Sequence, residues 1–233
     1  NNITPATVLE VYEPEMVRWL FAKYAPTDGF AFNFDDTIIR HYSEFDKGLE
    51  AVKNGEADEY NTAVYDLCMI NGINVKAKVP FGVLASVAPI VDFNPQAVRE
   101  MLAKIGVEFD ARDEERLVRV KNWITKHQPS KMYKLLEKRN DEYYSGLSDE
   151  EKAAVKKLAD YIEEHDNVKE QEIQQYLYGI INDPSLTKKE NMVRQQKFFA
   201  VFYNVLFGCD KGPRLYLFLS AIDKSKYLNL LKF

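Results

Sequence analysis

Residues 111–129 read ARDEERLVRVKNWITKHQP, and this stretch indicates the fold class of the chain. At about 100° of rotation per helical residue, Leu117, Val120 and Ile124 lie within roughly 60° of one another and should face a core. Pro129 ends the pattern, because a proline disfavours helical backbone at the residue before it. The stretch therefore predicts a long amphipathic helix over residues 111–127.

A second face of the same helix is basic. Within roughly 80° of arc it collects Arg112, Arg116, Arg119, Trp123 and Lys126. Lys131 continues this basic block beyond the helix. Two interpretations are open. Either the cations hold RNA phosphates while Trp123 stacks on an unpaired base, or Trp123 flanks the core and the arginine stems cover it.

Helix signals also follow one another in the rest of the chain. Thr4-Pro5 and Asn94-Pro95 are typical of helix starts, and Gly106 and Gly208 are typical of helix ends. Capping boxes begin at Ser148 and Thr187, each with a glutamate three residues later. The stretch VPFGVLASVAPIV at residues 79–91 is apolar nearly all round and should be buried.

Two segments near the start are less regular. FAFNF at residues 30–34 alternates as a strand does, and residues 48–79 allow a short helix and an edge hairpin. We therefore expect a mostly α chain. A small mixed α/β region at residues 1–79 would precede an all-α domain, a helix bundle or cage, at residues 80–233.

Composition limits the classes of protein to consider. The chain has 233 residues, 46% of them apolar, and a formal net charge of −5, so it can form a sizeable core. Cys68 and Cys209 cannot make a disulfide framework, and no apolar run reaches the roughly 18 residues of a membrane helix. These features predict a cytoplasmic protein without a membrane partner.

The net charge hides two basic blocks. Residues 116–139 carry 8 basic side chains and 1 acidic, and residues 187–233 carry 9 and 3. Between them, residues 140–186 carry 4 basic and 12 acidic side chains. Such blocks can be solvated helix faces, but an acidic protein can also present a basic groove to a polyanion.

The second basic block contains GCDKGPRLYLF at residues 208–218. Two glycines allow a tight turn there, and Pro213 can open the next helix. Lys211 and Arg214 would stand at its amino end and could bind a phosphate together with free N–H groups. The alternative is an ordinary corner between two helices with solvated charges.

Familiar catalytic patterns are absent from the sequence. It has no glycine-rich phosphate loop and no G-x-S-x-G turn, and Asp35-Asp36 is more typical of a helix cap. His41, His127 and His165 have no histidine or cysteine at metal-ligand spacing. We therefore predict no catalytic residue, no metal and no cofactor in this chain.

In four stretches the sequence resembles the C-terminal part of class I lysyl-tRNA synthetases. These are NNITPATVLEVYEPEMVRWLFAKYAPT, VPFGVLASVAPIV, RLVRVKNWITKHQP and KFFAVFYNVLFGCDKGPRLYLFL. The HIGH-type and KMSKS-type signatures of that family do not occur. In the family the KMSKS-type loop precedes a stretch like residues 1–12, so the resemblance implies a fragment that begins just past the catalytic domain. Tyr216 departs from the family, which often has glycine after GPRL.

The resemblance implies a lysine–tRNA ligase that activates lysine with ATP and charges tRNA(Lys). In it, residues 1–79 would form the connecting, stem-contact region, and residues 80–233 the helical anticodon-binding domain. ATP would bind in the catalytic domain of the same chain, and the anticodon arm would be the partner here. The equivalent domain of a glutamyl-tRNA synthetase, or a non-catalytic helical protein-interaction scaffold, are the alternatives. The sequence leaves the oligomeric state open.

Overall fold

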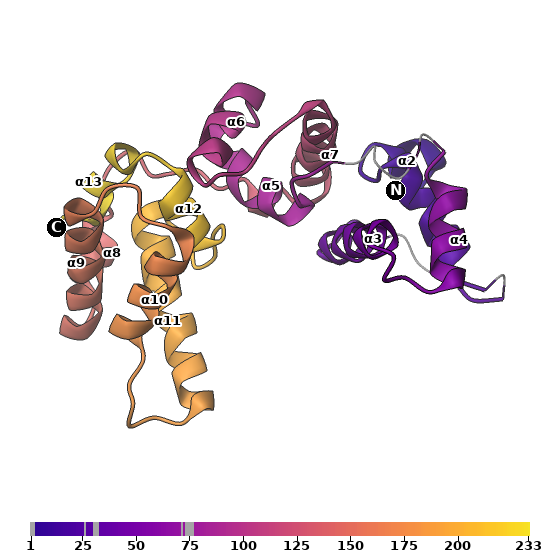
Figure 1. The fold of residues 1–233 in the computed structure, drawn as a ribbon. Helices are drawn as coiled ribbons and strands as arrows, with labels where there is room; N and C mark the ends of the chain where they lie inside the picture. Colours follow the sequence, from indigo (N-terminus) through magenta and orange to yellow (C-terminus); the bar gives the residue numbers. More distant parts are fainter. Residues whose placement is uncertain (1–2, 26, 30–32, 71, 73–76) are drawn as a thin grey trace. The chain divides into compact units, whose positions relative to one another are not determined.

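The structure is a computed structural model that describes residues 3–25, 27–29, 33–70, 72 and 77–233. Every regular element among these residues is a helix, and none of them is in a strand, which confirms the mostly α class (Figure 1). Most of the strand expected at residues 30–34 lies outside the described residues, as does much of the hairpin expected before residue 79.

Close packing divides the chain into two compact units. Unit 1 comprises Asn1–Arg99 and Val107–Met132, and unit 2 comprises Glu100–Gly106 and Tyr133–Phe233. The α-helices that lie wholly in unit 1 are α1 (Pro5–Leu9), α2 (Pro14–Lys23), α3 (Thr37–Lys53), α4 (Glu59–Cys68), α5 (Phe81–Val87) and α7 (Ala111–His127). Two 3₁₀ helices, η1 (Ala88–Val91) and η2 (Pro129–Lys131), belong to it as well. Helix α6 (Pro95–Lys104) contributes residues to both units.

Unit 2 is built on three long helices. Its elements are α8 (Asp141–Ser145), α9 (Asp149–Glu164), α10 (Glu170–Ile181), α11 (Lys188–Phe207), α12 (Leu215–Ala221), η3 (Lys224–Lys226) and α13 (Leu228–Leu231). Helices α9, α10 and α11 lie side by side, and α12 packs against α10 (Figure 1). Phe218 fixes α12 in the core, because its ring lies 5.2 Å from that of Phe207 and 5.3 Å from that of Tyr227.

Local capping signals place most helix ends as predicted. The hydroxyls of Thr4, Ser148 and Thr187 each accept a hydrogen bond from the backbone N–H three residues later. Gly208 ends α11 in the left-handed region, with φ 71°. These bonds satisfy N–H and C=O groups that a helix end would otherwise leave unpaired.

The structure gives bounds to one helix that the sequence left open and moves the start of another. Residues 59–68, inside the segment that the sequence left irregular, form α4 because Asp58 caps the main-chain N–H of Asn61. Helix α12 begins at Leu215 rather than at Pro213. The cause is a tertiary hydrogen bond, since the Tyr203 hydroxyl donates to the Pro213 carbonyl at 2.8 Å and holds that residue in the turn.

Unit 1 is held together by the guanidinium of Arg116 on α7. The side chain has no exposed surface, and its Nε lies 2.7 Å from Glu13 while Nη1 lies 2.7 Å from Asp46 on α3. Nη1 also donates to the Val79 carbonyl at 3.1 Å. Burial opposes the charged form, but the two carboxylates outweigh it and raise the pKa of Arg116 above its usual range.

A second buried group ties the same helix to the preceding loop. Asp113, fully buried, accepts hydrogen bonds at 2.7 Å from the backbone N–H groups of Lys78 and Val79. Together these contacts join α7 to residues before 80, so the first compact unit extends to Met132. The predicted functional division at residues 79 and 80 stays a prediction, and it does not coincide with this packing boundary.

We expect Arg116→Met to destabilise unit 1 by about 3–5 kcal/mol, because Glu13 and Asp46 would lose the buried positive charge that lies between them. The matched control on the same helix is Arg112→Met, since Arg112 is exposed and pairs with Glu115 only at the surface. Its effect should stay within about 0.5 kcal/mol. Urea denaturation measures both, and equal losses would contradict the account of Arg116.

Close packing between α3 and α4 depends on Gly48. A Cβ atom there would lie 2.1 Å from the hydroxyl oxygen of Tyr65, which donates to the Phe45 carbonyl. We expect Gly48→Ala to cost about 1–3 kcal/mol of unfolding free energy. Gly179→Ala on α10, where no atom lies within 4 Å, should instead stabilise by about 0.5–1 kcal/mol. Thermal denaturation compares the two, and a stabilising Gly48→Ala would refute the packing argument.

Candidate nucleic-acid interface

The predicted cationic face of α7 is used largely inside unit 1. Arg116 is enclosed by the two carboxylates described above. Arg119 donates from Nε to the Tyr12 carbonyl at 3.3 Å, and Lys126 lies 2.8 Å from a carboxylate oxygen of Glu10. The face therefore docks α7 against the segment around residues 10–13. Arg116 in particular is not available to a ligand in this structure.

Trp123 is also part of the core. Its indole is fully buried, donates its N–H to the Phe34 carbonyl at 3.0 Å, and packs against Phe81 with ring centroids 5.5 Å apart. Of the two interpretations left open by the sequence, the structure favours the core one. A buried ring offers no face on which a nucleotide base could stack.

Two further residues of this set lie at the edge of unit 1. Arg112 is partly exposed and pairs with Glu115 at 3.0 Å, one turn along its own helix. Lys131 lies 3.0 Å from Asp36, and its ammonium stands 5.8 Å from the centre of the Trp123 ring. With Lys126, whose side chain is 48% exposed, and the half-buried Arg119, they are the predicted cations of unit 1 that keep solvent access.

The other two predicted residues lie in unit 2, between α11 and α12. Lys211 is exposed, and Arg214 is 55% exposed at the N-cap of α12, where its Nε lies 3.6 Å from Glu170. The turn that carries them packs closely on α11, because a Cβ on Gly212 would come within 2.3 Å of the Tyr203 ring. Ion pairs at exposed positions are weak, so both cations stay open to competition by phosphate.

Three aromatic side chains beside this turn were missed by the sequence reasoning. Tyr178 on α10, Phe199 on α11 and Tyr216 on α12 are each half-buried. They come from three helices, so no spacing within one helix reveals that they meet. The only local signal was the RLY sequence, in which Tyr216 stands two residues after Arg214.

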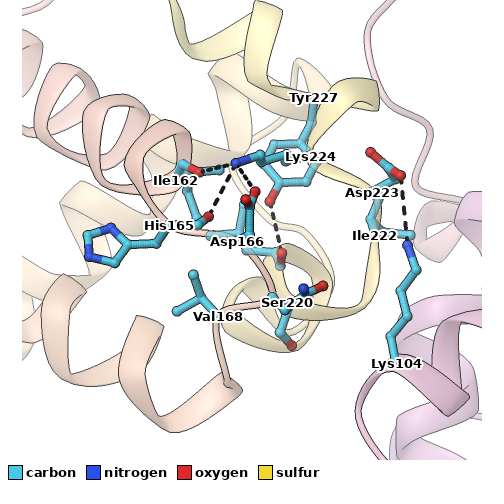
Figure 2. Close-up of a pocket in the computed structure, with 12 residues that line it drawn as sticks. Lys104, Ile162, His165, Asp166, Val168, Ser220, Ile222, Asp223, Lys224 and Tyr227 are labelled. Atoms are coloured by element: carbon cyan, nitrogen blue, oxygen red, sulfur yellow. Dashed lines mark hydrogen bonds and ion pairs between the residues drawn. The ribbon is translucent and has the colours of Figure 1, made fainter.

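A polar cavity of about 250 Å³ in unit 2 has its charges already paired. Figure 2 shows Lys224 reaching the end of α9, where its ammonium donates to main-chain oxygens at 3.1–3.3 Å. The same ammonium lies 2.5 Å from Asp166, and Lys104 pairs with Asp223 at 3.9 Å. Lys224 thus caps the carbonyl end of α9, which carries partial negative charge.

Neither a metal cluster nor a membrane-spanning helix occurs among the described residues. No group of three or more His, Cys, Asp or Glu side chains there is arranged to hold a metal ion. No helix in this part of the chain has both the length and the apolar character needed to cross a membrane. The basic, partly aromatic surfaces are therefore the strongest candidates for a functional site.

Comparisons with known proteins show similarity to lysine–tRNA ligases. Residues 1–71 match the family model described as tRNA synthetases class I (K). A lysine–tRNA ligase of Thermococcus kodakarensis is 26% identical over 100% of this chain and 45% of its own length. The lysine–tRNA ligase of Streptomyces coelicolor is 26% identical over 98% of this chain and 42% of its own length. The lysine–tRNA ligase of Borreliella burgdorferi is 28% identical over 94% of this chain and 42% of its own length.

The chain spans less than half of the length of the curated relatives it matches. These relatives are lysine enzymes, so the glutamyl-tRNA synthetase alternative is not supported. The match extends over both compact units and includes the stretches that carried the sequence resemblance. The chain is thus similar to lysine–tRNA ligases along its whole length, and the class I tRNA synthetase model matches its residues 1–71.

Proposed function

We propose that this chain is the tRNA-binding, C-terminal portion of a lysine–tRNA ligase that acts in the cytoplasm. The observation that carries the proposal is the similarity to lysine–tRNA ligases over the full length of the chain. In the whole enzyme, lysine would be activated with ATP and transferred to tRNA(Lys). That chemistry belongs to a catalytic domain outside these residues, because the HIGH-type and KMSKS-type signatures do not occur here.

Within this chain we assign the anticodon arm to unit 2 and its basic turn. Lys211 and Arg214 are exposed, whereas Arg116 and Trp123 serve the core of unit 1. Arg112, Lys126 and Lys131, with the half-buried Arg119, would contribute weaker phosphate contacts in unit 1. Phosphate contacts fix the register of an RNA, while unpaired bases carry the sequence information.

We expect Lys211→Ala and Arg214→Ala each to weaken binding of the tRNA(Lys) anticodon stem–loop and to reduce its salt dependence. Each lost phosphate contact lowers the slope of log Kd against log salt concentration by about one unit or less. Lys156→Ala is the matched control, because that lysine pairs with Asp160 at 2.8 Å on an acidic part of α9. Fluorescence anisotropy over a series of salt concentrations measures all three.

The assignment to tRNA predicts selectivity as well as affinity. At moderate salt the anticodon stem–loop of tRNA(Lys) should bind more tightly than an unrelated hairpin of equal length. Equal affinity for the two RNAs would contradict anticodon recognition. A slope that Lys211→Ala and Arg214→Ala leave unchanged would instead show that the arm binds elsewhere on the chain.

Catalysis is expected only from the whole enzyme. We predict that the 233-residue chain alone gives no lysine-dependent ATP–pyrophosphate exchange, because the HIGH-type and KMSKS-type signatures do not occur in it. Exchange is measured with labelled pyrophosphate, with a full-length lysine–tRNA ligase as positive control. Exchange by the chain alone at a rate above background would contradict the placement of catalysis outside these residues.

A further inference from the structure

Three helices of unit 2 bring aromatic rings together at one surface. The ring centroids of Phe199 and Tyr216 lie 6.2 Å apart at an interplanar angle of 78°, an edge-to-face arrangement. Burial, and next a side-chain hydrogen bond with Tyr178, raise the pKa of the Tyr216 phenol. Each of the three rings is half-buried, so packing holds it while part of its surface stays accessible. These residues, Tyr178, Phe199 and Tyr216, are called the aromatic cluster below.

Positive charge adjoins this cluster. Arg214 precedes Tyr216 by two residues and is 55% exposed, and Lys211 is exposed in the same turn. Glu170 lies 3.6 Å from Arg214 and neutralises that guanidinium only in part. An aromatic surface with cations at its rim matches the two parts of a nucleotide, the base and the phosphate.

The geometry is fixed before any ligand binds. Tyr203 lies on α11 one turn after Phe199, with ring centroids 6.3 Å apart, and its hydroxyl holds the Pro213 carbonyl at 2.8 Å. The same ring fills the space beside Gly212. The turn with the cations is thereby pinned to the helix that carries Phe199. Such preorganisation lowers the entropy cost of binding.

We propose that the aromatic cluster is a stacking site for an unpaired RNA base, with Arg214 and Lys211 holding the neighbouring phosphates. The proposal rests on the proposed function and names the residues that would read the loop of the bound arm. An unpaired base can leave its stack to lie on an aromatic ring, whereas a base inside a duplex cannot. The phenol groups of Tyr178 and Tyr216 can also hydrogen-bond the edge of that base.

Charge distinguishes this cluster from a second exposed aromatic pair in unit 2. Tyr161 and Tyr176 stack on each other with centroids 3.9 Å apart. The charges that act on Tyr176 are those of Asp160 and Glu164, and they raise its phenol pKa further after burial has raised it. Carboxylates repel phosphate, so this pair should not bind RNA although its rings are half-buried like those of the cluster. It supplies a matched control.

The test uses the 233-residue chain and a fluorescein-labelled anticodon stem–loop of tRNA(Lys). Tyr216→Leu and Phe199→Leu should each weaken binding by about 5- to 100-fold, the effect of losing one stacked base. The slope of log Kd against log salt should stay unchanged, because no charge is removed. Tyr216→Phe should keep most of the affinity, and Tyr176→Leu should bind as the wild type does.

A second measurement separates lost stacking from lost folding. The stem–loop carries 2-aminopurine at one loop position at a time, and stacking on the cluster should quench its fluorescence in the wild type at one position. Circular dichroism confirms that each variant is folded. A variant that still binds RNA should lose this quenching, since the remaining cations hold the phosphates without the ring.

The outcomes keep the two proposals apart. If the wild type binds the stem–loop while Tyr216→Leu and Phe199→Leu bind with equal affinity and quenching, the stacking site is refuted and the tRNA-binding function stands. If a duplex of the same length binds as tightly as the stem–loop, an unpaired base is not the ligand. If the wild type binds no RNA, the proposed function fails and the stacking site fails with it.

Discussion

Unit 1 depends on one buried charge, the guanidinium of Arg116. An arginine keeps its proton under all ordinary conditions, so burying it requires countercharges in place of water. Glu13 and Asp46 supply them from segments far apart in the sequence, and the ring of Tyr42 lies 5.0 Å from the guanidinium carbon. Because α7 carries this residue, its position relative to α3 and to the segment before α2 is set by electrostatics as well as by apolar packing.

This constraint changes what the basic block at residues 116–139 can do. Several of its cations pair with acidic or carbonyl groups of residues 10–46, among them Arg116, Lys126 and Lys131. Less of the positive charge therefore faces solvent than the sequence suggests. The turn at residues 208–214 keeps its cations exposed beside aromatic rings, so unit 2 is the better candidate for a nucleic-acid surface. Acidic surfaces elsewhere would favour docking at that turn over general coating.

Local physics explains which features were predictable. The capping boxes at Ser148 and Thr187 and the left-handed Gly208 act within one helical turn, so residue types alone indicate them. The start of α12 was misplaced because Tyr203, ten residues before Pro213, holds that proline in the turn. The short helix allowed within residues 48–79 is α4, and its bounds were left open because its apolar residues form a weak pattern in a polar segment.

Residue types and their spacing were enough to predict the helical class and most helix ends and to show the resemblance to lysyl-tRNA synthetases, because periodicity, caps and similarity are properties of short segments or of residue identity. Whether Trp123 and Arg116 face a ligand or the core followed only from the packing of unit 1, because their helical positions suit both equally well. Their burial depends on Phe34, Glu13 and Asp46, which folding brings to α7. The meeting of Tyr178, Phe199 and Tyr216 is likewise a product of packing between three helices, which no one-dimensional spacing records.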